Sequence, residues 1–214
     1  MPKRFLIITS AHINKNKDVR REDYIKSVES FIRYGEYFDR VFVLECIETE
    51  GVEYLKLDDK VEVVYSRLGN FYHNKGINEI LHIRDFLKRR EDIDMDDVVV
   101  KATGRYELES DDFLKNLDMD YDIIAKDESD IWKNHGGVTR GVHTFYIAYK
   151  KRTVFDIVDF IDIEMNPLFS VRYNIEWYIL DYMKKNKNCL LYKGRMGIIT
   201  NFDHNPFGPA RIST

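Results

Sequence analysis

Two short segments contain the residue types that bind an anionic ligand. Asn74-Lys75-Gly76 precedes a stretch with apolar residues at helical spacing, so it falls at the start of a predicted helix. Three consecutive valines run directly into the second segment, residues 101–105. Free amides at a helix start, a mobile lysine and a bidentate arginine are groups that hold phosphate oxygens. The pattern favours a pyrophosphate site made by Asn74, Lys75, Gly76, Lys101, Thr103, Gly104 and Arg105.

Both segments also have a purely structural interpretation. Asn74 could cap the helix and leave Lys75 exposed to solvent. Lys101 and Arg105 could pair with nearby carboxylates, because a cation in a central strand is costly to bury without an anion. The sequence leaves these alternatives open.

Small hydroxyl residues and carboxylates complete the candidate site. Thr9, Ser10 and Ser66 end the first and third predicted strands, where small side chains let a base or ribose approach closely. Asp127, Asp130 and Glu176 are the candidate catalytic residues, since a carboxylate can act as base or nucleophile toward a sugar. Asp127, Asp130 and His204 are the candidate metal ligands. The competing explanations are a solvated acidic loop and, for Glu176, a helix dipole that favours any acid in the first turn.

An alternation of strands and helices must position these residues. The pattern predicts strands over residues 4–9, 40–45, 61–66, 97–102, 121–126 and 143–149, and an edge strand over 190–193. It predicts helices over residues 21–34, 74–88, 111–117, 152–161 and 174–185, and an irregular tail over 201–214. The order indicates an α/β fold with a mixed, mostly parallel central sheet flanked by helices, and the strand with three valines is expected at its centre. Ligands of such sheets bind outside the carboxyl ends of the strands, so functional residues should cluster just after strands.

The composition fits one globular domain. The 214 residues are 44% apolar and suit a single domain, with a nucleotide-binding half over about 1–106 and an acceptor half over about 107–214. The net charge is −4 with both signs interspersed, which argues against nucleic acid as a partner. The two cysteines favour a reducing compartment, and no apolar stretch predicts a signal peptide or membrane span. We therefore expect a cytoplasmic protein, with further domains of a longer polypeptide left open.

The two anion-binding segments, taken in order, resemble those of small bacterial and viral GT-A glycosyltransferases. The similarity is greatest to the amino-terminal transferase domain of large-DNA-virus proteins that glycosylate a chlorella-virus major capsid protein, up to roughly residue 193. The motifs are Asn74-Lys75-Gly76-x-x-Glu79 and Asp97-Val98-Val99-Val100-Lys101-x-Thr103-Gly104-Arg105-Tyr106. The resemblance implies a Rossmann-like GT-A fold, a nucleotide diphosphate-sugar donor, commonly a UDP-sugar, and a hydroxyl acceptor on a glycan or glycoprotein. It also implies Mn²⁺ or Mg²⁺ on the pyrophosphate in many members, favours retention at the anomeric carbon, and places a viral member in the host cytoplasm.

The sequence departs from this family at the end of the fourth strand. Many members have an Asp-x-Asp metal motif there, whereas this chain has Thr103-Gly104-Arg105. Asp-x-Asp triplets occur within residues 92–96 and 118–122, but they precede predicted strands and are expected as solvated loops at the opposite edge. Metal dependence therefore stays open between two alternatives. Either the candidate ligands hold a metal, or Lys101 and Arg105 take over much of its electrostatic role.

Two other functions remain as alternatives. A nucleotidyltransferase that makes sugar nucleotides would need a glycine-rich run with Arg and Lys soon after the first strand, and residues 10–18 contain no glycine. A non-catalytic carbohydrate- or protein-binding module would need no nucleotide at all. The sequence does not specify the sugar, the acceptor or the linkage.

Overall fold

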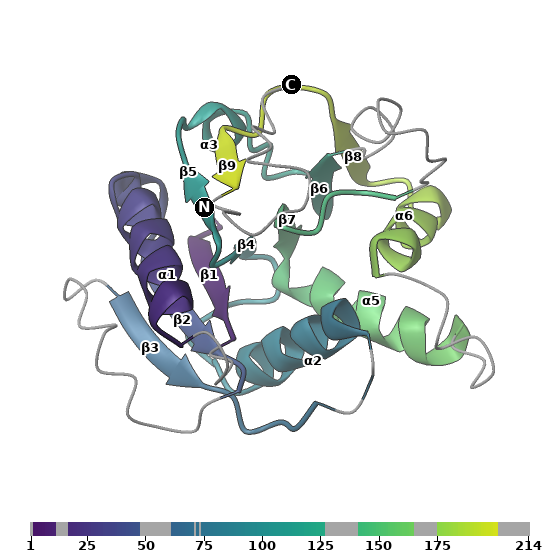
Figure 1. The fold of residues 1–214 in the computed structure, drawn as a ribbon. Helices are drawn as coiled ribbons and strands as arrows, with labels where there is room; N and C mark the ends of the chain where they lie inside the picture. Colours follow the sequence, from purple (N-terminus) through teal and green to yellow (C-terminus); the bar gives the residue numbers. More distant parts are fainter. Residues whose placement is uncertain are drawn as a thin grey trace, which may run out of the picture.

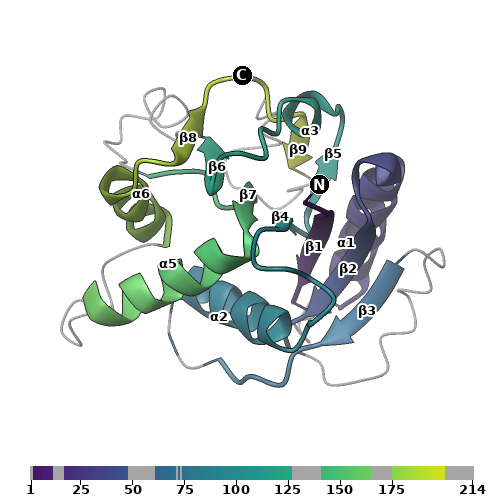
Figure 2. The same cartoon turned by 180° about the vertical axis from the view of Figure 1, so that it is seen from behind.

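The structure is a computed structural model that describes residues 2–11, 17–47, 61–70, 72, 74–126, 141–164 and 175–200. Its centre is a seven-stranded sheet with helices on both faces (Figures 1 and 2). The strands are β1 (Arg4–Ser10), β2 (Arg40–Glu45), β3 (Val61–Tyr65), β4 (Val98–Thr103), β6 (Ile123–Lys126), β7 (Tyr146–Lys150) and β8 (Cys189–Tyr192). Across the sheet they follow the order β3-β2-β1-β4-β7-β6-β8.

Neighbouring strands run parallel except at β7, which is antiparallel to both β4 and β6. This confirms the predicted mixed, mostly parallel sheet, and β4 lies at its middle as its run of valines predicts. Since β7 runs the opposite way, its first residue lies at the same edge of the sheet as the last residues of the other strands. That edge therefore collects the segments after the six strands that run in one direction and the segment before β7.

Helices cover the two faces of the sheet through two separate cores. The helices are α1 (Lys17–Ile32), α2 (Lys75–Lys88), α3 (Asp112–Lys115), α5 (Lys151–Glu164) and α6 (Ile175–Lys185), with a 3₁₀ turn η2 (Gly35–Tyr37). Successive side chains of a strand point to opposite faces. In β1, Phe5 and Ile7 accordingly pack with α2, α5 and α6, whereas Leu6 and Ile8 pack with α1 and α3. Among the described residues, no helix combines the length and the apolar character needed to cross a bilayer.

Several boundaries differ from the prediction for identifiable reasons. Helix α1 begins at Lys17, earlier than the predicted start at residue 21, and β7 begins at Tyr146, later than the predicted start at 143. The residues before β7 leave the ladder because the His143 amide donates to the Lys126 carbonyl (2.7 Å) and the Thr144 carbonyl accepts from a lysine ammonium (2.6 Å). The predicted helix over 111–117 is reduced to the single turn of α3, and the predicted tail over 201–214 lies outside the described residues.

A small second sheet was not predicted. Strands β5 (Tyr106–Leu108) and β9 (Ile198–Thr200) pair antiparallel beside α1 and α3 (Figure 1). Three residues are too few to show a period of two, and the partners are far apart in the sequence, so no local pattern indicates this pairing.

The acidic triplets lie at the amino-terminal edge of the sheet, away from the ends of the parallel strands. The expectation that they are merely solvated is wrong for three members, one of which is Asp96, which pairs with Arg152. Arg90 binds Asp92 at 2.6 Å, and this contact lowers the pKa of Asp92 to about 2. Asp122 binds Lys150 (3.1 Å) and a second basic residue, Arg152 (2.7 Å). These partly exposed ion pairs each contribute about 0–1 kcal/mol, so they fix local geometry more than they stabilise the fold.

Candidate functional site

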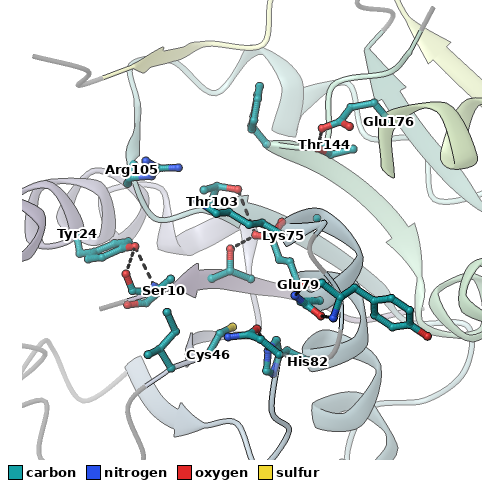
Figure 3. A pocket seen from close by; sticks show the side chains of 18 residues that line it. Ser10, Tyr24, Cys46, Lys75, Glu79, His82, Thr103, Arg105, Thr144 and Glu176 are labelled. Atoms are coloured by element: carbon teal, nitrogen blue, oxygen red, sulfur yellow. Dashed lines mark hydrogen bonds between the residues drawn. The ribbon is translucent and has the colours of Figure 1, made fainter. Parts of the chain in front are cut away.

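The carboxyl edge of the sheet contains a cavity of about 570 Å³ (Figure 3). Its walls come from the ends of β1, β2 and β4, the loop after β3, the first turns of α2 and α6, and the residues before β7. The lining residues are Thr9, Ser10, Ala11, Tyr24, Cys46, Ile47, Asn70, Tyr72, Lys75, Gly76, Asn78, Glu79, His82, Thr103, Arg105, Thr144, Phe145 and Glu176. Predicted site residues from the ends of β1 and β4 and from the start of α2 line this cavity, and their functional roles stay predictions.

A polar network forms the floor of this cavity around Glu79. Lys101, 2% exposed, donates from its ammonium to Glu79 Oε2 (2.8 Å), to the Thr103 hydroxyl (2.8 Å) and to the Thr144 carbonyl (2.6 Å). The Thr9 hydroxyl donates to Glu79 Oε1, and the Thr103 hydroxyl lies 3.3 Å from the same oxygen. An ammonium has three N–H donors, so all of those of Lys101 are used inside the protein.

This network decides between the two interpretations of Lys101. The pairing with a carboxylate is the one that the structure shows, and Lys101 does not line the cavity. Its charge acts on the cavity through Glu79 and Thr103, which do line it. Lys101 therefore positions a carboxylate rather than offering a donor to a ligand.

The turn after β4 is held against β1 by a close backbone approach. The Gly104 amide donates to the Thr9 carbonyl at 2.9 Å. A Cβ atom at Gly104 would lie 2.8 Å from that carbonyl oxygen and 2.6 Å from the ring of Tyr24, so glycine is required here. The Tyr24 hydroxyl in turn bonds the amide (2.9 Å) and carbonyl (3.0 Å) of Ala11. These contacts fix the position of Gly104 and so of the next residue, Arg105, whose side chain lines the cavity.

The first turn of α2 forms another wall. Asn74 caps the helix, and its side-chain oxygen accepts from the amides of Gly76 (2.9 Å) and Ile77 (3.2 Å). Lys75 is exposed and lines the cavity. A Cβ atom at Gly76 would lie 2.2 Å from Ile175, so glycine lets the first turn of α6 approach the first turn of α2. Lys75 and Arg105 thus share one cavity, as the phosphate-site prediction requires.

Glu176 lies across the cavity from His82 and Cys46 (Figure 3). It occupies the first turn of α6, and its carboxylate accepts from the Thr144 hydroxyl at 3.0 Å. Its half-buried carboxylate is therefore oriented toward the residues before β7 and lines the cavity. Among the predicted catalytic residues it is the one that the structure describes.

A second buried carboxylate lies at the end of β2. Glu45 is 0% exposed, accepts from the Ser10 hydroxyl, and accepts from the Ile47 amide at 3.0 Å. Ser10 was predicted as a ligand contact and lines the cavity, whereas Glu45 was not singled out. Its position at the last residue of a buried strand is the signal that identifies it, as it is for Lys101 near the end of β4.

The loop after β3 is shaped by side chains of α2. Asn78 exchanges two hydrogen bonds with the backbone of Tyr72, at 3.0 and 2.6 Å. Ser66 contacts His82 at 2.5 Å and does not line the cavity, so its predicted role as a ligand contact shifts to a supporting one. Burial lowers the pKa of His82, and the ring is therefore neutral at physiological pH.

Three predicted site residues, Asp127, Asp130 and His204, lie outside the described residues. Within the described ranges, no three His, Cys, Asp or Glu side chains gather in a group that could hold a metal ion. Sequence reasoning also missed several lining residues that carry no motif: Tyr24, Cys46, Ile47, His82, Thr144 and Phe145.

Neither a protein-family profile nor a curated protein matches the chain in sequence. The three-dimensional comparison identifies the fold class. The mixed seven-stranded sheet with flanking helices is the GT-A fold found in glycosyltransferases. This confirms the predicted fold class.

Particular neighbours show how close the likeness is. The galactosyltransferase LgtC, in complex with donor and acceptor sugar analogues, matches with a TM-score of 0.57 and 9% identity over 88% of this chain and 73% of its own. The 4-diphosphocytidyl-2C-methyl-D-erythritol synthase of Anaerococcus prevotii matches with a TM-score of 0.57 and 13% identity, over 92% and 90%. A glycosyltransferase involved in glycosylation of the PBCV-1 major capsid matches with a TM-score of 0.53 and 7% identity, over 90% and 82%. At these identities the likeness establishes the fold, and it supports the resemblance to the chlorella-virus enzymes.

Proposed function

We propose that the protein is a glycosyltransferase that moves a sugar from a nucleotide diphosphate-sugar, a UDP-sugar in the first instance, to a hydroxyl of a glycan or glycoprotein. The observation that carries the proposal is the cavity at the carboxyl edge of a GT-A sheet. It combines two basic side chains, Lys75 and Arg105, with two carboxylates, Glu79 and Glu176. Cations suit a diphosphate and carboxylates suit the sugar.

The residues divide between the two halves of the reaction. Lys75 and Arg105 would bind the diphosphate and stabilise its charge as the glycosidic bond breaks. Glu176, held by Thr144, would lie near the anomeric carbon or the acceptor hydroxyl and act as base or nucleophile. Glu79 is tied to Lys101 and is suited to hydrogen-bonding a hydroxyl of the donor.

A divalent metal is part of the proposal only through residues outside the described ranges. Mn²⁺ or Mg²⁺ would be held by Asp127, Asp130 and His204, and it would supply positive charge at the diphosphate. The described residues alone do not form a ligand set, so no step above is assigned to a metal. Asp127 and Asp130 also remain proposed catalytic carboxylates, and retention at the anomeric carbon remains the proposed outcome.

The expected setting of the enzyme is the cytoplasm, the host cytoplasm for a viral protein. Both cysteines, Cys46 and Cys189, are free thiols, which supports a reducing compartment. The nucleotide-binding half ending near residue 106 and the acceptor half after it share one sheet, because β4 pairs with β7. This continuity supports a single domain.

A nucleotidyltransferase is the second candidate, because the A. prevotii synthase shares the fold over most of both chains. The absence of glycine from residues 10–18 weighs against it. Thermal shift with UDP, UDP-sugars, CTP and UTP separates the candidates. A diphosphate at 100 times its Kd should stabilise a transferase by about 2.7 kcal/mol, which is roughly 5–10 °C. Stabilisation by triphosphates alone would indicate the nucleotidyltransferase, and no stabilisation by any nucleotide would indicate a binding module.

Matched variants test the assigned roles. Lys75→Ala and Arg105→Ala should each weaken UDP binding by about 10- to 100-fold, the worth of a charged hydrogen bond. Lys88→Ala is the control, since Lys88 is exposed at the opposite end of the same helix as Lys75. Unchanged affinity in both cavity variants would remove these residues from the diphosphate site.

Glu176→Gln tests the chemical step. It should lower turnover by roughly 10²- to 10⁴-fold while the Kd for UDP stays unchanged. Asp181→Asn on the same helix is the control, because Asp181 is 57% exposed and pairs with Lys184. Full activity of the Glu176→Gln enzyme would show that this carboxylate is not the acid or base.

A further inference from the structure

A chain of hydrogen bonds links the loop after β3 to the cavity wall. The Leu68 amide donates to Ser66 Oγ at 3.2 Å, and this hydroxyl lies 2.5 Å from His82 Nδ1. The other ring nitrogen, Nε2, lies 3.2 Å from Asn70 Oδ1. Ser66 and His82 are 8% and 1% exposed, whereas Asn70 is exposed and lines the cavity. A buried scaffold therefore ends in one side chain that a ligand can touch.

The chemistry of these groups fixes the direction of the chain. A carboxamide oxygen only accepts, so His82 Nε2 carries a proton toward Asn70. A neutral imidazole has a single N–H, so Nδ1 accepts from the Ser66 hydroxyl, whose oxygen accepts the backbone amide. Burial lowers the pKa of His82 and keeps the ring neutral, although nearby carboxylates act in the opposite direction. Asn70 Oδ1 is thus held toward His82, and Nδ2 is directed away from it.

The amide nitrogen of Asn70 is the part left for a ligand. Within the ranges that the structure describes, no protein group accepts a hydrogen bond from Nδ2. The two N–H donors of this nitrogen can bind an oxygen of a ligand. Opposite an amino group of a ligand, they would place donor against donor and form no hydrogen bond. A fixed donor pair of this kind rejects the wrong ligand because one polar group stays unpaired.

The surroundings of Asn70 suit a nucleobase better than a phosphate or a sugar. Cys46 and Ile47 line the same cavity, and Ile47 exposes 42% of its surface, which offers an apolar contact for a flat ring. Figure 3 places Cys46 and His82 on the side of the cavity opposite Glu176. A nucleotide-sugar with its sugar near Glu176 would therefore place its base on this side.

We propose that Asn70, oriented by Ser66 and His82, reads a keto oxygen of the donor nucleobase and so selects uracil or guanine against cytosine and adenine. The inference rests on the proposed function and deepens it, because it assigns a residue to the choice of nucleotide. Uracil and cytosine differ at the exocyclic group of C4, where uracil has an oxygen and cytosine an amino group. Guanine and adenine differ in the same way at C6, so two matched pairs of ligands distinguish pyrimidine from purine donors.

The test is the Kd of UDP, CDP, GDP and ADP, measured by isothermal titration calorimetry on the whole chain. The native protein should bind the keto member of at least one pair about 10- to 100-fold more tightly than its amino partner. Asn70→Asp replaces the donors with an acceptor, since His82 Nε2 would still donate to one carboxylate oxygen. This variant should reverse the preference toward CDP or ADP. Ser66→Ala frees the tautomer of His82 and should reduce the ratio without reversing it.

Control variants distinguish a failure of the Asn70 inference from a failure of the proposed glycosyltransferase function. Asn70 is exposed, so its substitution should leave the melting temperature within about 2 °C. Asn116→Asp, at the exposed C-cap position just after α3, should leave the ratio unchanged. Equal affinity for both members of each pair, or an unchanged ratio in Asn70→Asp, would overturn the inference while Lys75-dependent binding upheld the proposed function. No binding of any nucleotide would overturn both.

Discussion

The ion pair between Lys101 and Glu79 should show an unequal response to the loss of either partner. Lys101 exposes 3% of its side chain and Glu79 exposes 23%. Glu79→Met leaves the ammonium of Lys101 nearly buried with the Thr103 hydroxyl and the Thr144 carbonyl but without its counter-charge. Leaving such a charge uncompensated costs about 3–5 kcal/mol. For a chain of this size that is a fall in melting temperature of roughly 6–20 °C.

The reverse substitution should cost less. Lys101→Met leaves Glu79 with the Thr9 hydroxyl as donor and with access to water, because its carboxylate faces the cavity. The Thr144 carbonyl then loses its donor, and Glu79 loses one charge-assisted hydrogen bond. Together these losses should lower the free energy of unfolding by about 1–3 kcal/mol. The double variant removes both charges and should be more stable than Glu79→Met alone.

Urea denaturation at neutral pH, followed by intrinsic fluorescence, gives the three free energies of unfolding for a double-mutant cycle. UDP affinity measured on the same samples reports whether Glu79 is held in place for the ligand. The physical reasoning is refuted if Lys101→Met costs as much as Glu79→Met. It is equally refuted if the double variant loses the sum of the two single losses.

Three further outcomes follow from the described residues. Gly104→Ala should destabilise the fold by about 1–3 kcal/mol, because the new Cβ atom would meet a backbone oxygen and the ring of Tyr24, whereas Gly35→Ala, with nothing within 4 Å, should stay within about 0.5 kcal/mol; equal urea midpoints would contradict this. Asn74→Ala should cost about 1 kcal/mol of stability through the loss of the α2 cap, measured in the same way. Burial, with a smaller effect from a nearby lysine, lowers the pKa of His143 to about 4, below its unfolded value near 6.5, so the unfolded chain binds the extra proton first as pH falls. Stability should therefore drop by about 3 kcal/mol between pH 6.5 and 4, and His143→Gln should remove this part of the slope; parallel pH profiles for the two proteins would rule it out.

The local sequence carries enough information for the layers of this fold. The continuous apolar run Phe5–Ile8 predicts a buried strand, and in the structure its successive side chains are buried on opposite faces of the sheet. The three valines of β4 predict its central position in the same way. The cap at Asn74 marks the start of α2. These features depend on neighbours within a few residues, so they can be predicted without knowing which distant segments pack against them.

The sequence also predicted the edge of the sheet where the cavity lies. Thr9, Ser10 and Thr103 end parallel strands and Arg105 follows one, and neighbouring parallel strands end at a common edge. That constraint is topological and needs no side-chain detail. Glu176 was predicted as a site residue from its carboxylate and its place in the first turn of a predicted helix, without any strand nearby.

Tertiary structure decided what the individual side chains do. Lys101 has the same local sequence whether it binds a phosphate or Glu79, and only the approach of α2 to β4 brings the carboxylate within 2.8 Å. The alternation of side chains along a strand does not reveal whether β7 runs parallel or antiparallel to β4. Thr144 could therefore not be placed at the cavity before the strand order and direction were known. Local propensity and hydrophobic pattern fix the elements because they act over one or two turns. Charge pairing and cavity walls depend on contacts between distant segments, which packing alone determines.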